Sequence, residues 1–122
     1  IFNLDKVDFN QPLYVVEGPI DSLFLPNCIA VGGSDFSKVT NEISKSNSTL
    51  IFDNEPRNKE IIKKMRSMGD QGYKVCVWPE TIKEKDINDM VLNQIPDIID
   101  VINSNTMQGL SLSLAINNWS KV

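Results

Sequence analysis

Short apolar runs alternate with amphipathic segments along most of the chain. Four runs have almost no polar interruption, which is typical of strands buried on both faces of a sheet, and they span residues 13–16, 28–31, 49–52 and 73–78. Helices are predicted at residues 20–25, 37–46, 87–92, 95–102 and 110–119, and a further one begins with Pro56 in its first turn. This alternation indicates an α/β fold. We expect a central parallel sheet of about four strands flanked by helices, with a C-terminal helical tail.

A polar segment at residues 103–109 divides the pattern into two parts. We expect residues 1–103 to form one domain and residues 104–122 to form a helical segment that packs on it or follows it. The apolar residues of this last segment are expected in a core rather than on a partner surface: Leu110, Leu112, Leu114, Ile116 and Trp119. Since the chain begins with Ile1 and not with Met, we expect it to be a piece of a longer protein.

The composition narrows the classes of protein and the kinds of functional site to which the chain could belong. The chain has 122 residues, of which 41% are hydrophobic and 23% charged, and this suits one globular domain. Its 12 Lys and Arg against 16 Asp and Glu give a net charge of −4, which argues against an autonomous nucleic-acid binder and favours a metal-binding or regulatory domain. Histidine is absent, and Cys28 and Cys76 lie far apart, which disfavours His-based sites, zinc ribbons and disulfide frameworks. Metal binding or acid–base chemistry would therefore depend on carboxylates.

Carboxylates follow three of the four predicted strands. Glu17 ends the first strand, Asp53 ends the third with Glu55 two residues later, and Asp86 and Asp89 follow the fourth. Ligands of parallel α/β sheets collect beyond the carboxyl ends of the strands, and converging carboxylates suit a hard cation such as Mg²⁺. Taken singly, Asp53, Glu55 and Asp86 fit helix caps or first-turn acids better. As a set at three strand ends, the acids favour a metal site.

Two residues close to Glu17 are expected to support an acidic site at this edge of the sheet. Gly18 would let the backbone turn tightly beside the carboxylate, because glycine adopts conformations that other residues avoid. Asp21 falls in the first turn of the next helix, where a hydrogen bond to a loop and simple stabilisation of the helix are nearly equal expectations.

The order and spacing of the acids resemble the TOPRIM domain, a metal-binding fold shared by bacterial-type primases, type IA and type II topoisomerases and certain nucleases. That family's Glu-Gly after the first strand is matched within residues 15–21 (VVEGPID), and its Asp-x-Asp after the third strand within residues 51–55 (IFDNE). Residues 85–89 (KDIND) resemble the third acidic motif of primase TOPRIM domains. Glu55 departs from the pattern, since it stands where the family has a second Asp and carries its oxygens on a longer stem.

The string from residue 13 to residue 91, roughly two thirds of the chain, is most similar to the primases of T4-type bacteriophages. This likeness includes residues 31–35 (VGGSD) and 74–79 (KVCVWP). The resemblance implies a DNA primase, a nucleotidyltransferase of the DNA-directed RNA polymerase type that makes short RNA primers on single-stranded DNA from ribonucleoside triphosphates. It also implies a replicative helicase as partner in a primosome, the cytoplasm of the infected bacterial cell as location, and no membrane.

The resemblance also implies roles for individual residues. It implies bound Mg²⁺, with Mn²⁺ as a substitute, held by Glu17, Asp53, Glu55 and Asp86. Glu17 and Asp53 would be catalytic, with Glu17 acting either as a metal ligand or as a general acid/base. The supporting residues would be Gly18, Asp21, Asn88 and Asp89. Because the zinc module and the basic template-binding lobe of such primases have no counterpart here, the isolated chain is expected to prime weakly or not at all.

Several cations follow the acidic turn. Arg57, which lies beside the acids, and Lys59 are the candidates for contact with nucleotide phosphates. For Lys63 and Lys64 a solvated helix face is the favoured interpretation.

Three alternatives remain open. A response-regulator receiver is also an acidic α/β domain of similar length, and Asp53 fits its phospho-acceptor, although the chain has a lone Glu-Gly after the first strand and no evident strand-five lysine. A TOPRIM nuclease or recombination domain would share the site but not the reaction. An inactive structural domain would bind no divalent ion.

Overall fold

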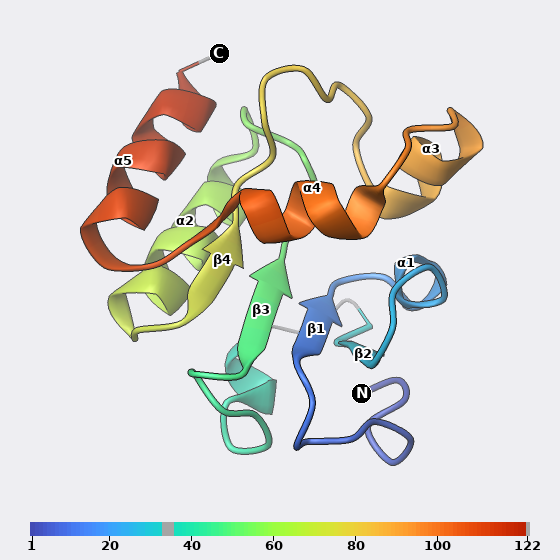
Figure 1. Cartoon of the computed structure of the whole chain (residues 1–122). Coiled ribbons are helices and arrows are strands. Elements are labelled where there is room, and N and C mark those ends of the chain that lie inside the picture. Colours follow the sequence, from blue (N-terminus) through green and yellow to red (C-terminus); the bar gives the residue numbers. More distant parts are fainter. Residues whose placement is uncertain (33–35, 122) are drawn as a thin grey trace.

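The central sheet has five strands in the order β2-β1-β3-β4-β5. In the computed structural model, which describes residues 1–32 and 36–121, helices lie on both faces of this sheet (Figure 1). The strands are β1 (Leu13–Val16), β2 (Cys28–Ala30), β3 (Ser48–Ile51), β4 (Lys74–Cys76) and β5 (Thr106–Met107). The first four are parallel, in agreement with the four predicted strands, and β5 is antiparallel to β4. The chain is thus an α/β protein with a mostly parallel sheet.

The fifth strand was not predicted. The segment 103–109, expected as a polar linker, contains β5, in which Met107 pairs with Val75 and Thr106 with Cys76. Two residues are too few to show an alternating pattern, so nothing in the local sequence marks this strand.

The helices are α1 (Pro19–Ser22), α2 (Lys59–Asp70), α3 (Ile87–Leu92), α4 (Ile98–Ser104) and α5 (Gly109–Ser120), together with the 3₁₀ turn η1 (Phe36–Val39). The predicted helix at 87–92 is confirmed, and those at 110–119 and 95–102 are confirmed with shifted ends. The helix expected at 20–25 is a single turn that ends at Ser22.

Two helix predictions were wrong in their extent. In the segment 37–46 only η1 is helical, and there the Thr40 hydroxyl donates to the carbonyl of Ser37 (2.9 Å). Such hydroxyl bonds offer the backbone an alternative to a continuous helix. Helix α2 begins at Lys59 rather than at Pro56, because Asn58 caps it by accepting hydrogen bonds from two backbone N–H groups. Of the segment 31–35, residues 33–35 lie outside the described part of the chain.

Alternate residues of the buried strands point into two separate cores. On one face, Leu13 and Val15 of β1 join a core that also contains residues of α2 and α5. On the other face, Tyr14 and Val16 join a core closed by α3 and α4 (Figure 1). This arrangement explains the unbroken apolar run of β1, since both faces of the sheet are covered.

Helix α5 belongs to the first of these cores. Its residues Leu112, Ile116 and Trp119 are buried there and the helix packs beside α2. Leu110 and Leu114, which were expected in the core, are instead 76% and 55% exposed. Their spacing along the helix places them away from the buried stripe, so only part of the expected apolar face is packed.

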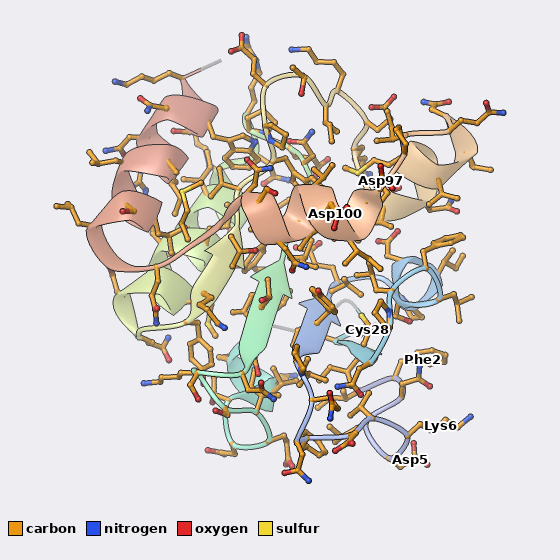
Figure 2. The ribbon with its side chains drawn as sticks, in the orientation of Figure 1. Phe2, Asp5, Lys6, Cys28, Asp97 and Asp100 are labelled. Atoms are coloured by element: carbon orange, nitrogen blue, oxygen red, sulfur yellow. The ribbon has the colours of Figure 1, made fainter. Side chains whose placement is uncertain are left out.

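The edge of the sheet at β2 is covered by the N-terminal segment. The backbone of Phe2 exchanges hydrogen bonds with Ala30 in an antiparallel bridge, and Figure 2 shows Phe2 close to Cys28 on this edge. Covering an edge strand in this way removes a template for pairing with another chain. Both cysteines are buried and free of disulfide bonds. Within the described residues, no helix has the length and apolar character that would let it cross a membrane.

Candidate functional site

The predicted acids gather where the connections of the sheet change direction. Strand β1 lies between β2 and β3, so the chain leaves β1 toward one edge and leaves β3 toward the other. Such a switch point leaves a crevice beyond the carboxyl ends of the two strands, where open α/β sheets bind ligands. Glu17 directly follows β1, and Asp53 lies two residues beyond the end of β3. The fold therefore brings these two acids, 36 residues apart in the sequence, to one edge.

Glu17 is half-buried and incompletely paired. Its Oε1 atom is buried and has no hydrogen-bond partner among the described residues. Burial raises the pKa of this carboxyl; the Lys64 ammonium acts against that rise, whereas Glu55 and Asp21 add to it. A buried carboxylate oxygen without a donor is costly, so its expected complement is a cation or a proton.

Lys64 was not expected near the site. Its neighbour Lys63 is exposed, as a solvated helix face predicts, whereas Lys64 is half-buried and its charge acts on Glu17. Spacing along the helix could have separated the two lysines, because Lys64 lies three residues after the buried Ile61 and four before the buried Met68.

Asp53 is the most strongly perturbed acid of the site. Its pKa is raised to about 7, mainly by burial and then by the nearby carboxyl groups of Glu17, Asp21, Asp86 and Glu55, in that order. No described residue donates a hydrogen bond to its carboxylate. The N-cap of α2 is Asn58, and its first-turn acid is Glu60. The capping interpretation of Asp53 is therefore wrong, and its charge has no local structural partner.

Glu55 connects the second acidic motif to the third. Its Oε1 lies 3.9 Å from Nζ of Lys85, and its Oε2 accepts a hydrogen bond from Nδ2 of Asn58 (3.3 Å). The longer side chain of Glu55, compared with the Asp of the family pattern, thus reaches across to residue 85. The exposed lysine of this pair would contribute little stability by itself.

Asp86 plays the capping role that the sequence left open for it. Its Oδ1 accepts the backbone N–H of Asp89 (2.8 Å), which makes it the N-cap of α3. It nevertheless lies close enough to Asp53 and Asp21 to raise the pKa of both carboxyls. Helix capping uses one of its oxygens, so the two interpretations of Asp86 are compatible.

Asp21 joins the first motif to the third. It is buried, and its Oδ1 accepts the backbone N–H of Asn88 over 2.9 Å. Burial raises its pKa; the bond from Asn88 opposes the rise, and Asp86 and Asp89 add to it. Of the two roles weighed for Asp21, the hydrogen bond to the loop is the one found.

The reason for a glycine at position 18 differs from the one expected. Gly18 has φ −98° and ψ 135°, a backbone conformation open to any residue. A Cβ atom there would lie 3.2 Å from Oδ2 of Asp21. The glycine therefore allows the close approach of Asp21 rather than an unusual backbone angle.

Asn54 is the centre of the local network and was missed in the sequence. Its side-chain amide donates to the carbonyls of Ile82 and Glu84, and its Oδ1 accepts the indole N–H of Trp119. The second tryptophan, Trp78, donates its indole N–H to the carbonyl of Phe52 (2.9 Å), just before Asp53. The only sequence signal for this role was the position of an amide side chain between two acids, Asp53 and Glu55, in the turn after β3.

Arg57 and Lys59 follow the acidic turn along the chain. Both are exposed, and Arg57 borders a cavity of about 380 Å³ together with Glu55 and Trp119. Lys59 is the first residue of α2 and borders a different cavity, which runs along that helix. Two further acids, Asp97 at the N-cap of α4 and Asp100 within it, are exposed (Figure 2), and neither is among the carboxyl groups that raise the pKa of Glu17, Asp21 or Asp53.

The chemistry of the donor set fits a hard divalent cation. Within residues 1–32 and 36–121 no group of three His, Cys, Asp or Glu residues is close enough to enclose a metal ion. The fit therefore depends on other observations: a buried Glu17 oxygen without a donor, an unpaired Asp53, and carboxylates that repel one another across the switch point. Carboxylate oxygens are the ligands that Mg²⁺ prefers in proteins.

Comparison with curated proteins finds a relative that matches this chain over its whole length. The chain is 33% identical, over 126 aligned residues, to the DNA primase of Enterobacteria phage T4. The chain is therefore similar to a region of that primase. The alignment spans 36% of the phage T4 DNA primase, so the chain corresponds to about a third of that relative. The chain matches no protein-family model.

Proposed function

We propose that this chain is the TOPRIM-type catalytic region of a DNA primase, a nucleotidyltransferase that builds short RNA primers on single-stranded DNA. The observation that supports this most is the pair Glu17 and Asp53. Both acids lie at the switch point, and neither the buried Glu17 Oε1 nor the Asp53 carboxylate has a hydrogen-bond donor among the described residues. The relation to a phage DNA primase supports the reaction class.

The residues that would hold Mg²⁺ are Glu17, Asp53, Glu55 and Asp86, directly or through water, with Mn²⁺ as a substitute. When bound, the ion would neutralise charge on the transferring phosphoryl group and lower the pKa of the attacking hydroxyl. Asp21, through Asn88, and Lys85, through Glu55, would fix the third motif against the first two.

Glu17 is the candidate for proton transfer. In primer extension the 3′-hydroxyl oxygen bonds to the α-phosphorus of the incoming nucleotide, the bond from that phosphorus to the bridging oxygen breaks, and pyrophosphate leaves. The hydroxyl proton needs an acceptor. The raised pKa of Glu17 and its unpartnered oxygen support that role, because a general base is most effective when its pKa lies near the working pH.

Other parts of such an enzyme would supply what this chain lacks. With a net charge of −4, the chain offers little electrostatic attraction for a template strand. We propose that template contacts and start-site recognition come from other regions of the intact protein, and that the isolated chain primes weakly or not at all. A replicative helicase as partner, and the cytoplasm of the infected cell as location, belong to the same proposal.

The receiver alternative has less support. Receivers share the strand order found here, but they are built from parallel strands, whereas β5 is antiparallel to β4. A TOPRIM nuclease would use the same acids, so primer synthesis and strand cleavage must be assayed side by side.

The test uses the intact protein. Glu17→Gln and Asp53→Asn should each abolish primer synthesis on single-stranded DNA with ribonucleoside triphosphates and Mg²⁺, while thermal unfolding shows an intact fold. Asp100→Asn, which changes an exposed acid of α4, is the matched control and should leave synthesis unchanged. Wild-type synthesis by a folded Asp53→Asn variant would refute the proposal, and cleavage without synthesis by the wild type would favour the nuclease.

A further inference from the structure

A cavity lies beside the acidic turn, bordered by Asn54 and Glu55 but not by Glu17 or Asp53. It measures about 380 Å³ and is bordered by the turn after Asp53, by the loop after β4 and by the end of α5. Its apolar wall consists of Pro56, Pro79, Ile82 and Trp119. This volume lies at the lower end of the range for small-molecule sites, about 300–1,000 Å³, and fits a ligand of nucleoside size rather than a polymer.

Charged side chains also border this cavity. Arg57 and Lys83 both border it and are exposed, and neither side chain forms a hydrogen bond or ion pair with another described residue. Glu80, also exposed, adds a hydrogen-bond acceptor. An apolar wall with two unpaired cations beside it is complementary to a heterocycle that carries phosphate groups.

The cavity adjoins the acidic site through Glu55. This residue borders the cavity and also raises the pKa of Glu17 and of Asp53, so it lies within electrostatic reach of both acids. The wall itself is held in place by Asn54, which bonds Trp119 of α5 and the carbonyl of Ile82. A ligand seated here would extend from a preformed apolar wall toward the acids.

We propose that this cavity binds the base and sugar of a nucleoside triphosphate, with Arg57 and Lys83 contacting its phosphates. The base lies against Pro56, Pro79, Ile82 and the edge of Trp119. Contact with such apolar and aromatic surfaces tolerates any base, which suits a site that must accept each incoming nucleotide in turn. This inference rests on the proposed function and adds a subsite to it.

The experiment measures nucleotide binding without divalent metal, so that it is independent of the acidic site. The ¹⁵N-labelled chain, in EDTA, is titrated with ATP and UTP and followed by amide and indole NMR. The two indole N–H signals form an internal comparison, because Trp119 borders the cavity, whereas Trp78 is buried and donates to the carbonyl of Phe52. Both nucleotides should shift the Trp119 indole and the amides of Arg57, Ile82 and Lys83 saturably, and should leave the Trp78 indole in place.

Two controls distinguish binding of the base from binding of the phosphates, and binding in the cavity from binding elsewhere on the surface. Inorganic tripolyphosphate should leave the Trp119 indole unmoved. Arg57→Gln should weaken ATP binding by about five-fold, the effect of one lost charge-assisted contact, whereas Lys63→Gln on the exposed side of α2 should change it by less than about two-fold.

Three results would overturn the inference: no saturable shift with either nucleotide, equal shifts with tripolyphosphate, or equal weakening by Arg57→Gln and Lys63→Gln. Failure of the proposed function would look different. If the acids bind no divalent ion, nucleotide binding in EDTA would persist. If only the cavity proposal is wrong, metal binding at the acids would persist without these shifts.

Discussion

The indole N–H of Trp119 donates to Oδ1 of Asn54 over 3.0 Å, and this bond joins the last turn of α5 to the turn that presents Asp53 and Glu55. Asn54 also holds the loop after β4 through the carbonyls of Ile82 and Glu84, each 3.0 Å away. Its backbone N–H donates to the carbonyl of Lys85. The second and third acidic motifs are therefore positioned by one amide side chain and by a helix far along the chain.

The Asn54–Trp119 bond should be measurable as an energetic coupling. We expect Trp119→Phe to lower the free energy of unfolding by about 1 kcal/mol and Asn54→Ala by about 2–3 kcal/mol, because the second change removes three side-chain hydrogen bonds. A double-mutant cycle in urea should give a coupling of about 1 kcal/mol. Strict additivity of the two changes would show that the bond contributes nothing to stability.

Asp53 should destabilise the metal-free protein at neutral pH. Its pKa is about 7 in the folded state against an ordinary value of 3.8, so the folded state binds more protons between these values. The stability linked to this group is full below about pH 4 and is lost as the pH rises through about 7. In EDTA at pH 8, Asp53→Asn should therefore raise the free energy of unfolding by about 1–2 kcal/mol, a figure reduced for solvent screening.

Urea unfolding at pH 4 and pH 8 checks this prediction. The gain in the free energy of unfolding from Asp53→Asn should nearly vanish at pH 4. Asp5→Asn, which changes an exposed acid near the N-terminus, is the control and should not raise this free energy at either pH (Figure 2). A loss of stability for Asp53→Asn at pH 8 would mean that its charge has a stabilising partner.

Gly18→Ala should loosen the link between the first and third motifs. The added Cβ would meet Oδ2 of Asp21 at 3.2 Å, so Asp21 must move by a few tenths of an ångström while its Oδ1 bonds Asn88. We expect faster hydrogen exchange at the Asn88 amide and a cost of about 1 kcal/mol, compared with about 1–3 kcal/mol for Asp21→Ala. Unchanged exchange at Asn88 in Gly18→Ala would contradict this role of the glycine.

The two cysteines should be unreactive in the folded protein. Burial raises the pKa of the Cys28 thiol to about 12 and that of Cys76 further still, so almost no thiolate exists at pH 8. A thiol reagent such as 5,5′-dithiobis(2-nitrobenzoate) should label both residues only at the rate of unfolding, and rapidly in urea. Fast labelling of either cysteine under native conditions would show that its strand opens locally.

The parts of the fold that the sequence predicted are those with a strong local pattern. Strands β1 to β4 lie in mainly apolar runs, and α3 and α5 have clear helical periodicity. The segment 37–46 was assigned incorrectly because Val39 and Ile43 are buried at helical spacing without a helix between them. Strand β5 depends on pairing with β4 and has no pattern of its own.

The candidate site likewise has residues that the sequence predicts and residues that it does not. Glu17 and Asp53 were predictable because an acid at the end of a buried strand is visible in the sequence. The contact from Trp119 to Asn54 spans 65 residues and depends on how α5 packs, so no local pattern announces it. The charge of Lys64 acts on Glu17 only because α2 packs against β4 of the sheet. These roles depend on contacts between elements that are distant in the sequence, and no local pattern reveals such contacts.

The most direct measurement is an amide NMR titration with Mn²⁺ of the wild-type chain and the Asp53→Asn variant, with Asp5→Asn as control. We expect paramagnetic broadening centred on Glu17, Asp53, Glu55 and Asp86 in the wild type and in the control, and its loss in Asp53→Asn. Broadening that reached Asp53 but spared residues 85–89 would favour a receiver-like site. The absence of localised broadening, or equal broadening in Asp53→Asn, would contradict a carboxylate metal site at the switch point.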